Sequence, residues 1–238
     1  MARFMWEYRR VVCARWFVGK SVVELGAGLG LCGVLASHLC RKGKVVITDG
    51  GEEFTDSAME TLRENLERNS CLPSYDERSS RADRAEVFLE RLTWGDHSDF
   101  VESHRSGFDF ILAADVLYAE EAVSPLLHTV ADILNLRRTR NEGDGMTTYP
   151  ESEHPVTAKD REARDDGSGE IGATAEAGVA GSCALPPSSS TFVLAFARRH
   201  VSIDRVLAEA EELGLRWKVP EDFSPTSSSE NIYLMWLA

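Results

Sequence analysis

The sequence lacks any apolar run long enough to cross a bilayer. Its longest such runs, FILAADVLYA at 110–119 and NIYLMWLA at 231–238, fall well short of the roughly 20 residues that a membrane helix needs. We therefore expect no membrane partner. Charges interrupt residues 1–20, and no apolar segment there leads to a small-residue cleavage site, so no secretory signal is expected either, although the arginines leave organelle targeting open.

Paired cysteines and clustered histidines are also lacking. The five cysteines are an odd number and none lies in a CxxC pair, so we expect neither a disulfide framework nor a zinc site. The six histidines are scattered without the spacing that lets two imidazoles share one metal. The sequence therefore predicts no metal centre, reduced thiols, and a location in the cytoplasm or the nucleus.

Basic residues are too few for a protein whose main partner is a nucleic acid. Lys and Arg number 26 against 39 Asp and Glu, a formal net charge of −13, whereas phosphate binding needs clustered bases. Much of the acidic excess lies in residues 141–190, which are rich in Gly, Ser, Ala and Glu and hold a single aromatic, Tyr149. Such a segment buries too little apolar surface to offset its ordering entropy. We expect a disordered acidic loop insertion over 139–190.

What the sequence does contain, outside this insertion, is an alternation of short apolar runs with amphipathic helical stretches. The runs predict strands at 21–25, 44–48, 85–90, 107–114, 191–198, 215–219 and 231–237. The amphipathic stretches predict helices near 3–17, 30–41, 53–69, 120–138 and 202–213. This alternation is typical of an α/β fold with a doubly wound parallel sheet. The last two strands follow each other without a helix, which predicts an antiparallel pair at one edge.

The strongest local signal is VVELGAGLGLCGV at 22–34, an apolar strand that runs into a glycine-rich turn and opens a helix. Glycines are needed where the backbone turns tightly and a ligand approaches it closely. Gly28, Gly30 and Gly33 satisfy the GxGxxG pattern of NAD and FAD sites. The loop therefore indicates a nucleotide-like ligand, with a nicotinamide enzyme as one candidate.

The residues before this pattern favour a different ligand. A dinucleotide loop has its first glycine directly at the strand end, whereas here Gly26 and Ala27 already occupy the turn and the strand ends at Glu24. An acid followed by GxGxG resembles the loop that binds S-adenosylmethionine (AdoMet). Asp49 ends the second strand, where a carboxylate can accept both ribose hydroxyls of either ligand; its alternative role is that of a helix cap.

Features from the whole chain, apart from the 137–190 loop, carry a family resemblance. The sequence resembles methyltransferase family 16, the lysine methyltransferase-like group of seven-strand protein methyltransferases. The features are RLTWGD at 91–96, FDFILAADVLY at 108–118, the VELGAGLG loop, Asn65 and Asn69, and Trp6. Only five residues precede Trp6, fewer than in this family, in which the upstream chain often forms part of the ligand lid or acceptor groove.

The resemblance implies a Rossmann-like doubly wound seven-stranded sheet, mostly parallel with an antiparallel C-terminal strand, in one class I methyltransferase domain over 1–238. It also implies AdoMet as cofactor and a lysine side chain of a protein as methyl acceptor. The cofactor-binding residues carried over are Trp6, Glu24, Gly26, Ala27, Gly28, Gly30, Asp49, Trp94 and Ala114. The catalytic residues carried over are Asp115 and Tyr118 of the D-x-x-Y element.

Other interpretations stay open at this point. Trp94 would also suit a cap over the core, Tyr118 an aromatic packed on the sheet, and Trp6 a helix-packing residue. Asp115 follows the apolar run FILAA, where an acid without a function is an awkward, partly buried charge. The alternative functions are a small-molecule N- or O-methyltransferase and a non-catalytic AdoMet-binding pseudoenzyme.

Overall fold

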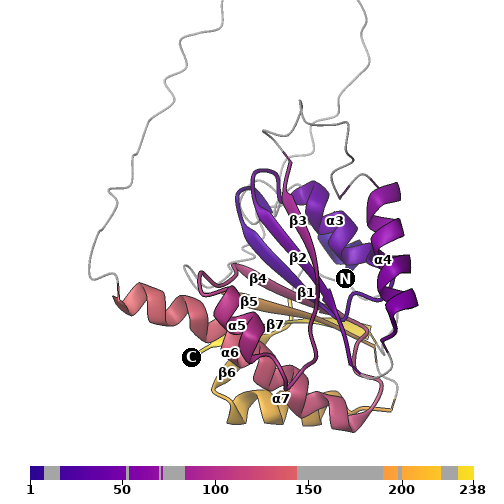
Figure 1. The fold of residues 1–238 in the computed structure, drawn as a ribbon. Coiled ribbons are helices and arrows are strands. Elements are labelled where there is room, and N and C mark those ends of the chain that lie inside the picture. Colours follow the sequence, from indigo (N-terminus) through magenta and orange to yellow (C-terminus); the bar gives the residue numbers. More distant parts are fainter. Residues whose placement is uncertain are drawn as a thin grey trace, which may run out of the picture.

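A seven-stranded mixed sheet forms the centre of the fold (Figure 1). The computed structural model describes residues 1–7, 17–51, 54–69, 71, 84–143, 190–197, 200–220 and 230–238. The strands are β1 (Ser21–Leu25), β2 (Lys44–Asp49), β3 (Glu86–Arg91), β4 (Phe110–Ala114), β5 (Thr191–Ala197), β6 (Leu215–Lys218) and β7 (Glu230–Leu237). They pair in the order β3-β2-β1-β4-β5-β7-β6.

The sheet is parallel from β3 through β5, and β7 then runs antiparallel to both of its neighbours, β5 and β6. The predicted mostly parallel sheet with an antiparallel C-terminal strand is thus confirmed. The strand order reverses direction between β1 and β4, which are adjacent in the sheet although β2 and β3 lie between them in the chain. Ligands of doubly wound folds bind at this switch point, outside the carboxyl ends of the strands.

Helices cover both faces of the sheet. They are α1 (Ala2–Glu7), α3 (Leu31–Leu39), α4 (Asp56–Arg68), α5 (Ser98–Ser103), the 3₁₀ turn η3 (Glu120–Ala122), α6 (Val123–Gly143) and α7 (Ile203–Glu212). Figure 1 shows α3 and α4 on one face and α5, α6 and α7 on the other. Among the described residues, no helix has the length and apolarity needed to cross a membrane.

Two predicted boundaries differ from the structure. Helix α6 continues to Gly143, past the expected start of the acidic insertion; the insertion from 144 to 189 lies outside the described residues. Helix α5 was not predicted, because it has only six residues and buries only Phe100, which leaves no helical period to detect. The expected first helix is described only at 2–7.

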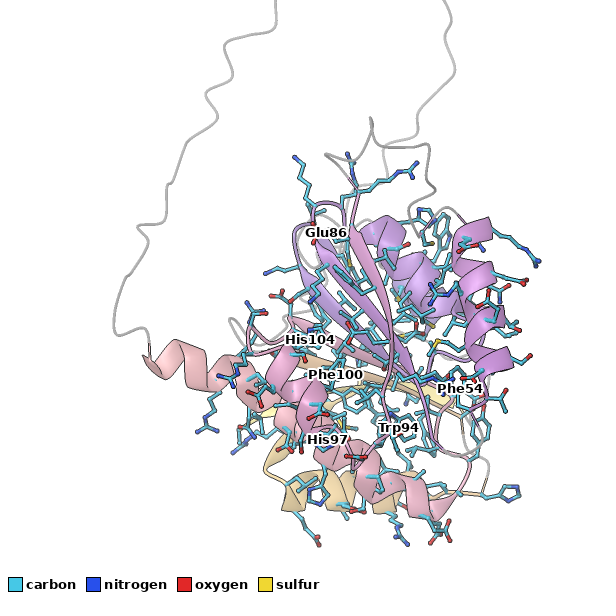
Figure 2. All side chains as sticks on the ribbon, in the orientation of Figure 1. Phe54, Glu86, Trp94, His97, Phe100 and His104 are labelled. Carbon is cyan, nitrogen blue, oxygen red and sulfur yellow. The ribbon has the colours of Figure 1, made fainter. Side chains whose placement is uncertain are left out.

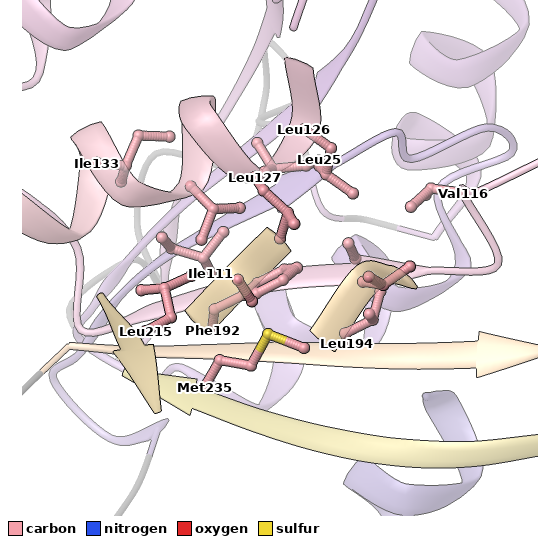
Figure 3. Close-up of a cluster of buried hydrophobic side chains, with 14 of the residues drawn as sticks. Leu25, Ile111, Val116, Leu126, Leu127, Ile133, Phe192, Leu194, Leu215 and Met235 are labelled. Carbon is pink, nitrogen blue, oxygen red and sulfur yellow. The ribbon is translucent and has the colours of Figure 1, made fainter. Parts of the chain in front are cut away.

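Each face of the sheet has its own core, because successive side chains of a strand point to opposite faces. On the first face, Val22 of β1 packs with Leu62 and Leu66 of α4 and with residues of α1 and α3. On the second face, Val23 and Leu25 join a larger cluster under α5, α6 and α7, part of which is drawn in Figure 3. Burial of both faces holds β1 and β4 firmly at the centre.

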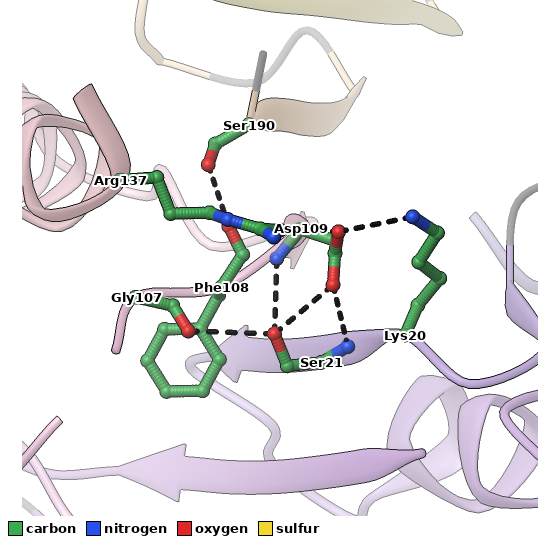
Figure 4. A network of polar contacts seen from close by, with 7 residues as sticks. All are labelled: Lys20, Ser21, Gly107, Phe108, Asp109, Arg137 and Ser190. Carbon is green, nitrogen blue, oxygen red and sulfur yellow. Dashed lines mark hydrogen bonds and ion pairs between the residues drawn. The ribbon is translucent and has the colours of Figure 1, made fainter. Parts of the chain in front are cut away.

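A polar network fastens the amino ends of β1 and β4 (Figure 4). Asp109, just before β4, accepts hydrogen bonds from the N–H and hydroxyl of Ser21 at 2.8 and 3.1 Å, and forms ion pairs with Lys20 at 3.3 Å and with Arg137 of α6. The hydroxyl of Ser190 donates a hydrogen bond to the carbonyl of Phe108 at 2.6 Å. Burial would raise the pKa of Asp109, but the Ser21 hydrogen bond and the two cations outweigh it and lower the pKa below its usual value.

Helix α5 is attached to the sheet through a histidine. Nδ1 of His104 lies 3.2 Å from Nζ of Lys44, and Nε2 lies 3.0 Å from a carboxylate oxygen of Glu90. Because a lysine ammonium only donates and a carboxylate only accepts, Nδ1 must be the acceptor and Nε2–H the donor. The imidazole also packs against the rings of Phe100 and Phe108, and Figure 2 shows His104 next to Phe100. His104 is therefore a satisfied structural histidine, as expected for the histidines of this chain.

Candidate functional site

The predicted site residues follow the carboxyl ends of neighbouring parallel strands. Gly26 follows β1, Asp49 ends β2 and Asp115 follows β4. Because β1 lies between β2 and β4 in the sheet, these three positions meet at one edge. This edge, at the carboxyl ends of the strands, is the switch point of the fold. The Asp109 network lies at the other end of β1 and β4, where these strands begin.

The glycine loop has the backbone that its sequence predicts. Gly26 and Gly28 have positive φ angles of 69° and 56°, and Ala27 between them donates its N–H to the carbonyl of Thr48 at 3.0 Å. A Cβ atom at Gly28 would meet nothing within 4 Å, so the backbone there faces open space. Gly30, with φ of 85°, precedes the first turn of α3. The loop thus combines a tight turn with an exposed backbone, the arrangement that a bound ligand requires.

Gly26 is also a point of close packing. A Cβ there would lie 2.8 Å from Cγ1 of Val116 and 3.0 Å from Cζ2 of Trp94. The loops after β1, β3 and β4 therefore converge on this glycine. Trp94 was predicted to belong to the site, whereas Val116 was not, because a valine in an apolar run carries no sequence signal beyond burial.

Trp94 lies at the corner of a tight turn between β3 and α5. Thr93 and Asp96 form an isolated antiparallel bridge, and Gly95 between them has a φ of 86°. Figure 2 shows Trp94 near the end of β3. Its half-buried indole packs on the second core cluster and also on Gly26. The two interpretations of Trp94, core cap and site residue, therefore both describe its contacts.

Glu24 is a buried acid with an unsatisfied oxygen. Its side chain is only 3% exposed, and Oε2 has no hydrogen-bond partner among the described residues. Burial raises its pKa to about 8, and the negative charge of Asp49 adds to this rise, while hydrogen bonds from the Gly33 backbone and from Cys32 oppose it. At neutral pH the carboxyl is therefore mostly protonated, and a cation placed beside it would favour its ionised form.

Asp49 connects β2 to the glycine loop. One of its carboxylate oxygens accepts the N–H of Gly28 at 2.6 Å, and the other accepts the N–H of Gly50 at 2.8 Å. Each oxygen keeps a second lone pair for a further donor. The alternative role as a helix cap is wrong, because α4 is capped by Thr55, whose hydroxyl accepts the N–H of Ala58 at 3.2 Å.

Asp115 has an unusual backbone conformation. Its φ is 56°, in the left-handed region, and its N–H donates to the carbonyl of Ala195 at 3.0 Å. Residues other than glycine adopt this region rarely, and such strain concentrates at functional sites. Ala114, the residue directly before Asp115, is half-buried and packs against the core cluster on the face that α1, α3 and α4 cover. Tyr118 is 56% exposed, so the alternative that it is packed away on the sheet is wrong.

Trp6 lies on α1, the helix that packs against α3. Phe4 and Met5 are buried in the core, whereas Trp6 is 54% exposed. Phe4 and Met5 are therefore the residues through which α1 packs into the core, and the interpretation of Trp6 as a helix-packing residue is not favoured. Its role in cofactor binding stays a prediction.

The residues at this edge fit the predicted ligand. AdoMet carries an ammonium, a sulfonium, two ribose hydroxyls and an adenine. The unpartnered Oε2 of Glu24 suits a cation, the free lone pairs of Asp49 suit hydroxyls, and the open space at Gly28 leaves room beside the backbone. Trp94 supplies an aromatic face. The described residues include no group of three or more His, Cys, Asp or Glu side chains able to hold a metal ion.

The sequence is also similar to those of known proteins. The protein N-lysine methyltransferase METTL21A of Danio rerio is 33% identical over 136 residues, which cover 55% of this chain and 54% of the relative. The Mus musculus METTL21A is 38% identical over 116 residues, which cover 48% and 44%. The chain thus spans about half the length of the curated relatives it matches.

A solved structure shows the same fold. The precorrin-6y C5,15-methyltransferase of Geobacter metallireducens superposes with a TM-score of 0.51 at 13% identity, covering 98% of this chain and 87% of that one. The likeness at this identity concerns the fold alone. The profile of the lysine methyltransferase family matches residues 11–141, more than half of the sequence, and the chain therefore belongs to that family.

Proposed function

We propose that this protein is an AdoMet-dependent N-methyltransferase that transfers a methyl group to a lysine side chain of a protein substrate. The observation that carries the proposal is the convergence on Gly26 of Trp94 and Val116, with Asp115 directly before Val116. This contact would bring the residues expected to hold the cofactor close to Asp115, the residue expected to bind the methyl acceptor. Family membership and the N-lysine methyltransferase names of the relatives support the choice of reaction and of a protein acceptor.

The residues of β1, β2 and the β3 loop would hold the cofactor. Glu24 would compensate the charge of the ammonium, Asp49 would accept the ribose hydroxyls, and Trp94 would flank the adenine or the sulfonium. When bound, AdoMet supplies a methyl group activated by a positively charged sulfur. The protein contributes chiefly by positioning, which accounts for much of the rate in such a displacement.

Asp115 and Tyr118 would manage the acceptor. A lysine ammonium must lose its proton before its nitrogen can attack, and apolar surroundings lower its pKa. Val116 and Leu117, which lie between the two catalytic candidates in the sequence, are both buried in the core and anchor this loop. Asp115 would accept a hydrogen bond from the amine and aim its lone pair, while the exposed Tyr118 would orient the side chain.

A small-molecule methyltransferase and a pseudoenzyme are the competing functions. The same fold serves small acceptors, as the precorrin enzyme illustrates. Against a pseudoenzyme, the glycine loop, Asp49 and Asp115 are all present at one edge of the sheet. Membership in the lysine methyltransferase family and the names of the relatives favour the protein acceptor.

The decisive test is transfer of labelled methyl from AdoMet into the proteins of a host lysate. The wild type is compared with Asp115→Asn, because asparagine also tolerates the left-handed backbone. We expect a discrete labelled protein band that Asp115→Asn abolishes and that the exposed control Asp99→Asn retains. Absence of any labelled protein, while AdoMet still raises the melting temperature, would contradict the protein acceptor.

We also propose a cytoplasmic or nuclear location and no nucleic acid as the main partner. Among the described residues, Cys32 and Cys71 are free thiols, which suits a reducing compartment. The net charge of −13 disfavours phosphate backbones. Fractionation of cells that express a tagged chain tests the location, and recovery of the chain from a secreted or organellar fraction would contradict it.

A further inference from the structure

One buried hydroxyl on α6 connects the helix to the Trp94 turn. Oγ1 of Thr129 lies 3.1 Å from the N–H nitrogen of Gly95, 2.8 Å from the carbonyl oxygen of Pro125 and 3.1 Å from Nδ1 of His97. Thr129 is completely buried. Its single hydrogen goes to the Pro125 carbonyl, which only accepts, and its oxygen accepts the N–H of Gly95. The buried hydroxyl thus bridges α6 and the turn that holds Trp94.

The turn held by Thr129 determines where Trp94 lies. Asp96 donates its N–H to the Thr93 carbonyl at 3.1 Å, so the turn has only Trp94 and Gly95 at its corner. Fixing the Gly95 N–H against α6 therefore fixes the backbone from which the indole projects. The imidazole of His97 adds a second attachment, because its Nε2 lies 2.8 Å from a carboxylate oxygen of Asp132, also on α6.

The same helix also begins at the other half of the site. Helix α6 starts at Val123, directly after η3 and the loop that holds Asp115 and Tyr118. Helix α6 thus contacts the turn that holds Trp94 and follows directly after the loop that holds Asp115 and Tyr118. Its buried hydroxyl is the direct hydrogen-bond link between α6 and Gly95.

We propose that Thr129 is a positioning residue for cofactor binding, acting by holding Trp94 against Gly26 through the N–H of Gly95. This inference rests on the proposed function, in which Trp94 contacts the cofactor. Thr129 itself touches no ligand in this arrangement. A residue that acts this way affects the affinity for AdoMet through Trp94, and not the chemistry at Asp115.

The test measures AdoMet binding by isothermal titration calorimetry, together with the melting temperature of the free protein. Thr129→Val keeps the shape but removes the acceptor, and we expect its Kd for AdoMet to rise about tenfold. Thr129→Ser keeps the hydroxyl and should restore binding to within about twofold of wild type. Ser190→Ala is the matched control: it also loses a buried hydroxyl hydrogen bond, of 2.6 Å, but at the opposite edge of the sheet. It should lower the melting temperature without changing the Kd.

A double-mutant cycle with Trp94→Ala tests the route of the effect. If Thr129 acts through Trp94, Thr129→Val will weaken binding no further once the indole is gone, and the two losses will be far from additive. Additive losses, or a Ser190→Ala variant that loses affinity as much as Thr129→Val, would overturn the proposal. In transfer assays at saturating AdoMet, kcat of Thr129→Val should stay within about twofold of wild type while KM for AdoMet rises.

The outcomes separate this inference from the proposed function. AdoMet binding needs no acceptor, so a wild type that binds AdoMet but labels no protein contradicts the protein-lysine activity and still yields the Thr129 comparison. A wild type with no heat of AdoMet binding and no rise in melting temperature overturns both.

Discussion

The carboxylate of Asp49 accepts the N–H of Gly28 at 2.6 Å, so the acid at the end of β2 also shapes the loop after β1. An Asp49→Ala variant would lose this bond together with the proposed ribose acceptor. We expect AdoMet to bind at least tenfold more weakly, measured by calorimetry. Asp56→Ala removes an exposed acid from α4 and serves as control. Equal affinity of wild type and Asp49→Ala would contradict the assignment.

Two glycines form a matched pair for testing the loop. Gly28 and Gly214 both have positive φ, and a Cβ at either would meet nothing within 4 Å. Replacing either glycine by alanine should lower the free energy of unfolding by about 1–2 kcal/mol, as measured by urea unfolding. Only Gly28→Ala should also abolish AdoMet binding, because its new methyl would fill the space beside the loop. Loss of binding in both variants would show a general effect of instability instead.

Glu24 predicts how stability depends on pH. Because burial raises its pKa from 4.5 to about 8, the folded protein holds a proton between these values that the unfolded chain has released. The free energy of unfolding of the ligand-free protein should therefore fall as the pH rises through this window and level off above it. Glu24→Gln should flatten this dependence, as followed by urea unfolding at several pH values. A wild type and a variant with parallel profiles would contradict the assignment.

The same acid predicts a proton release on cofactor binding. If the ammonium of AdoMet meets the ionised carboxylate, binding at pH 7 must expel the proton that Glu24 holds in the free protein. Calorimetry in buffers of different ionisation enthalpy should then give a buffer-dependent heat for the wild type. In Glu24→Gln this dependence should disappear. A wild-type heat independent of buffer would disprove the release.

Asp109 makes the opposite pH prediction at the opposite edge of the sheet. Its pKa is lowered in the fold, so it contributes stability above its ordinary value of 3.8, and this contribution is lost as the pH falls through the lower folded value. Asp109→Asn should cost about 1–3 kcal/mol at neutral pH, because it weakens bonds to Ser21, Lys20 and Arg137. The Kd for AdoMet should stay unchanged. A variant that loses affinity but not stability would be inconsistent with a purely structural role.

The sequence predicts this fold well where its signals are local. The runs at β1, β2 and β4 are mostly apolar, and Gly26, Asp49 and Asp115 mark their carboxyl ends, so the strands and their ends are readable from a few residues. The family motifs supplied Trp94, Asp115 and Tyr118. The left-handed backbone of Asp115 is set by residues far along the chain, such as Ala195, and no local pattern indicates it.

Contacts between distant segments explain what the sequence did not reveal. The approach of Val116 to Gly26 joins residues that are separated in the chain by β2, β3, β4 and the helices between them. Thr129 is one threonine in an otherwise ordinary helix, and its importance emerges only once Gly95 and His97 are placed against it. Polar residues that act through other residues carry no motif of their own.

The place of β7 has a consequence for the order in which the sheet is completed during synthesis. Strand β7 is inserted between β5 and β6, and β6 pairs with no other strand among the described residues. A nascent chain that has left the ribosome only as far as Lys218 contains the residues of β1 to β5 but has no strand to which β6 can attach. Until residues 230–237 emerge, the backbone edge of β5 stays open to pairing with other chains. Closure of that edge therefore waits for the synthesis of residues 230–237.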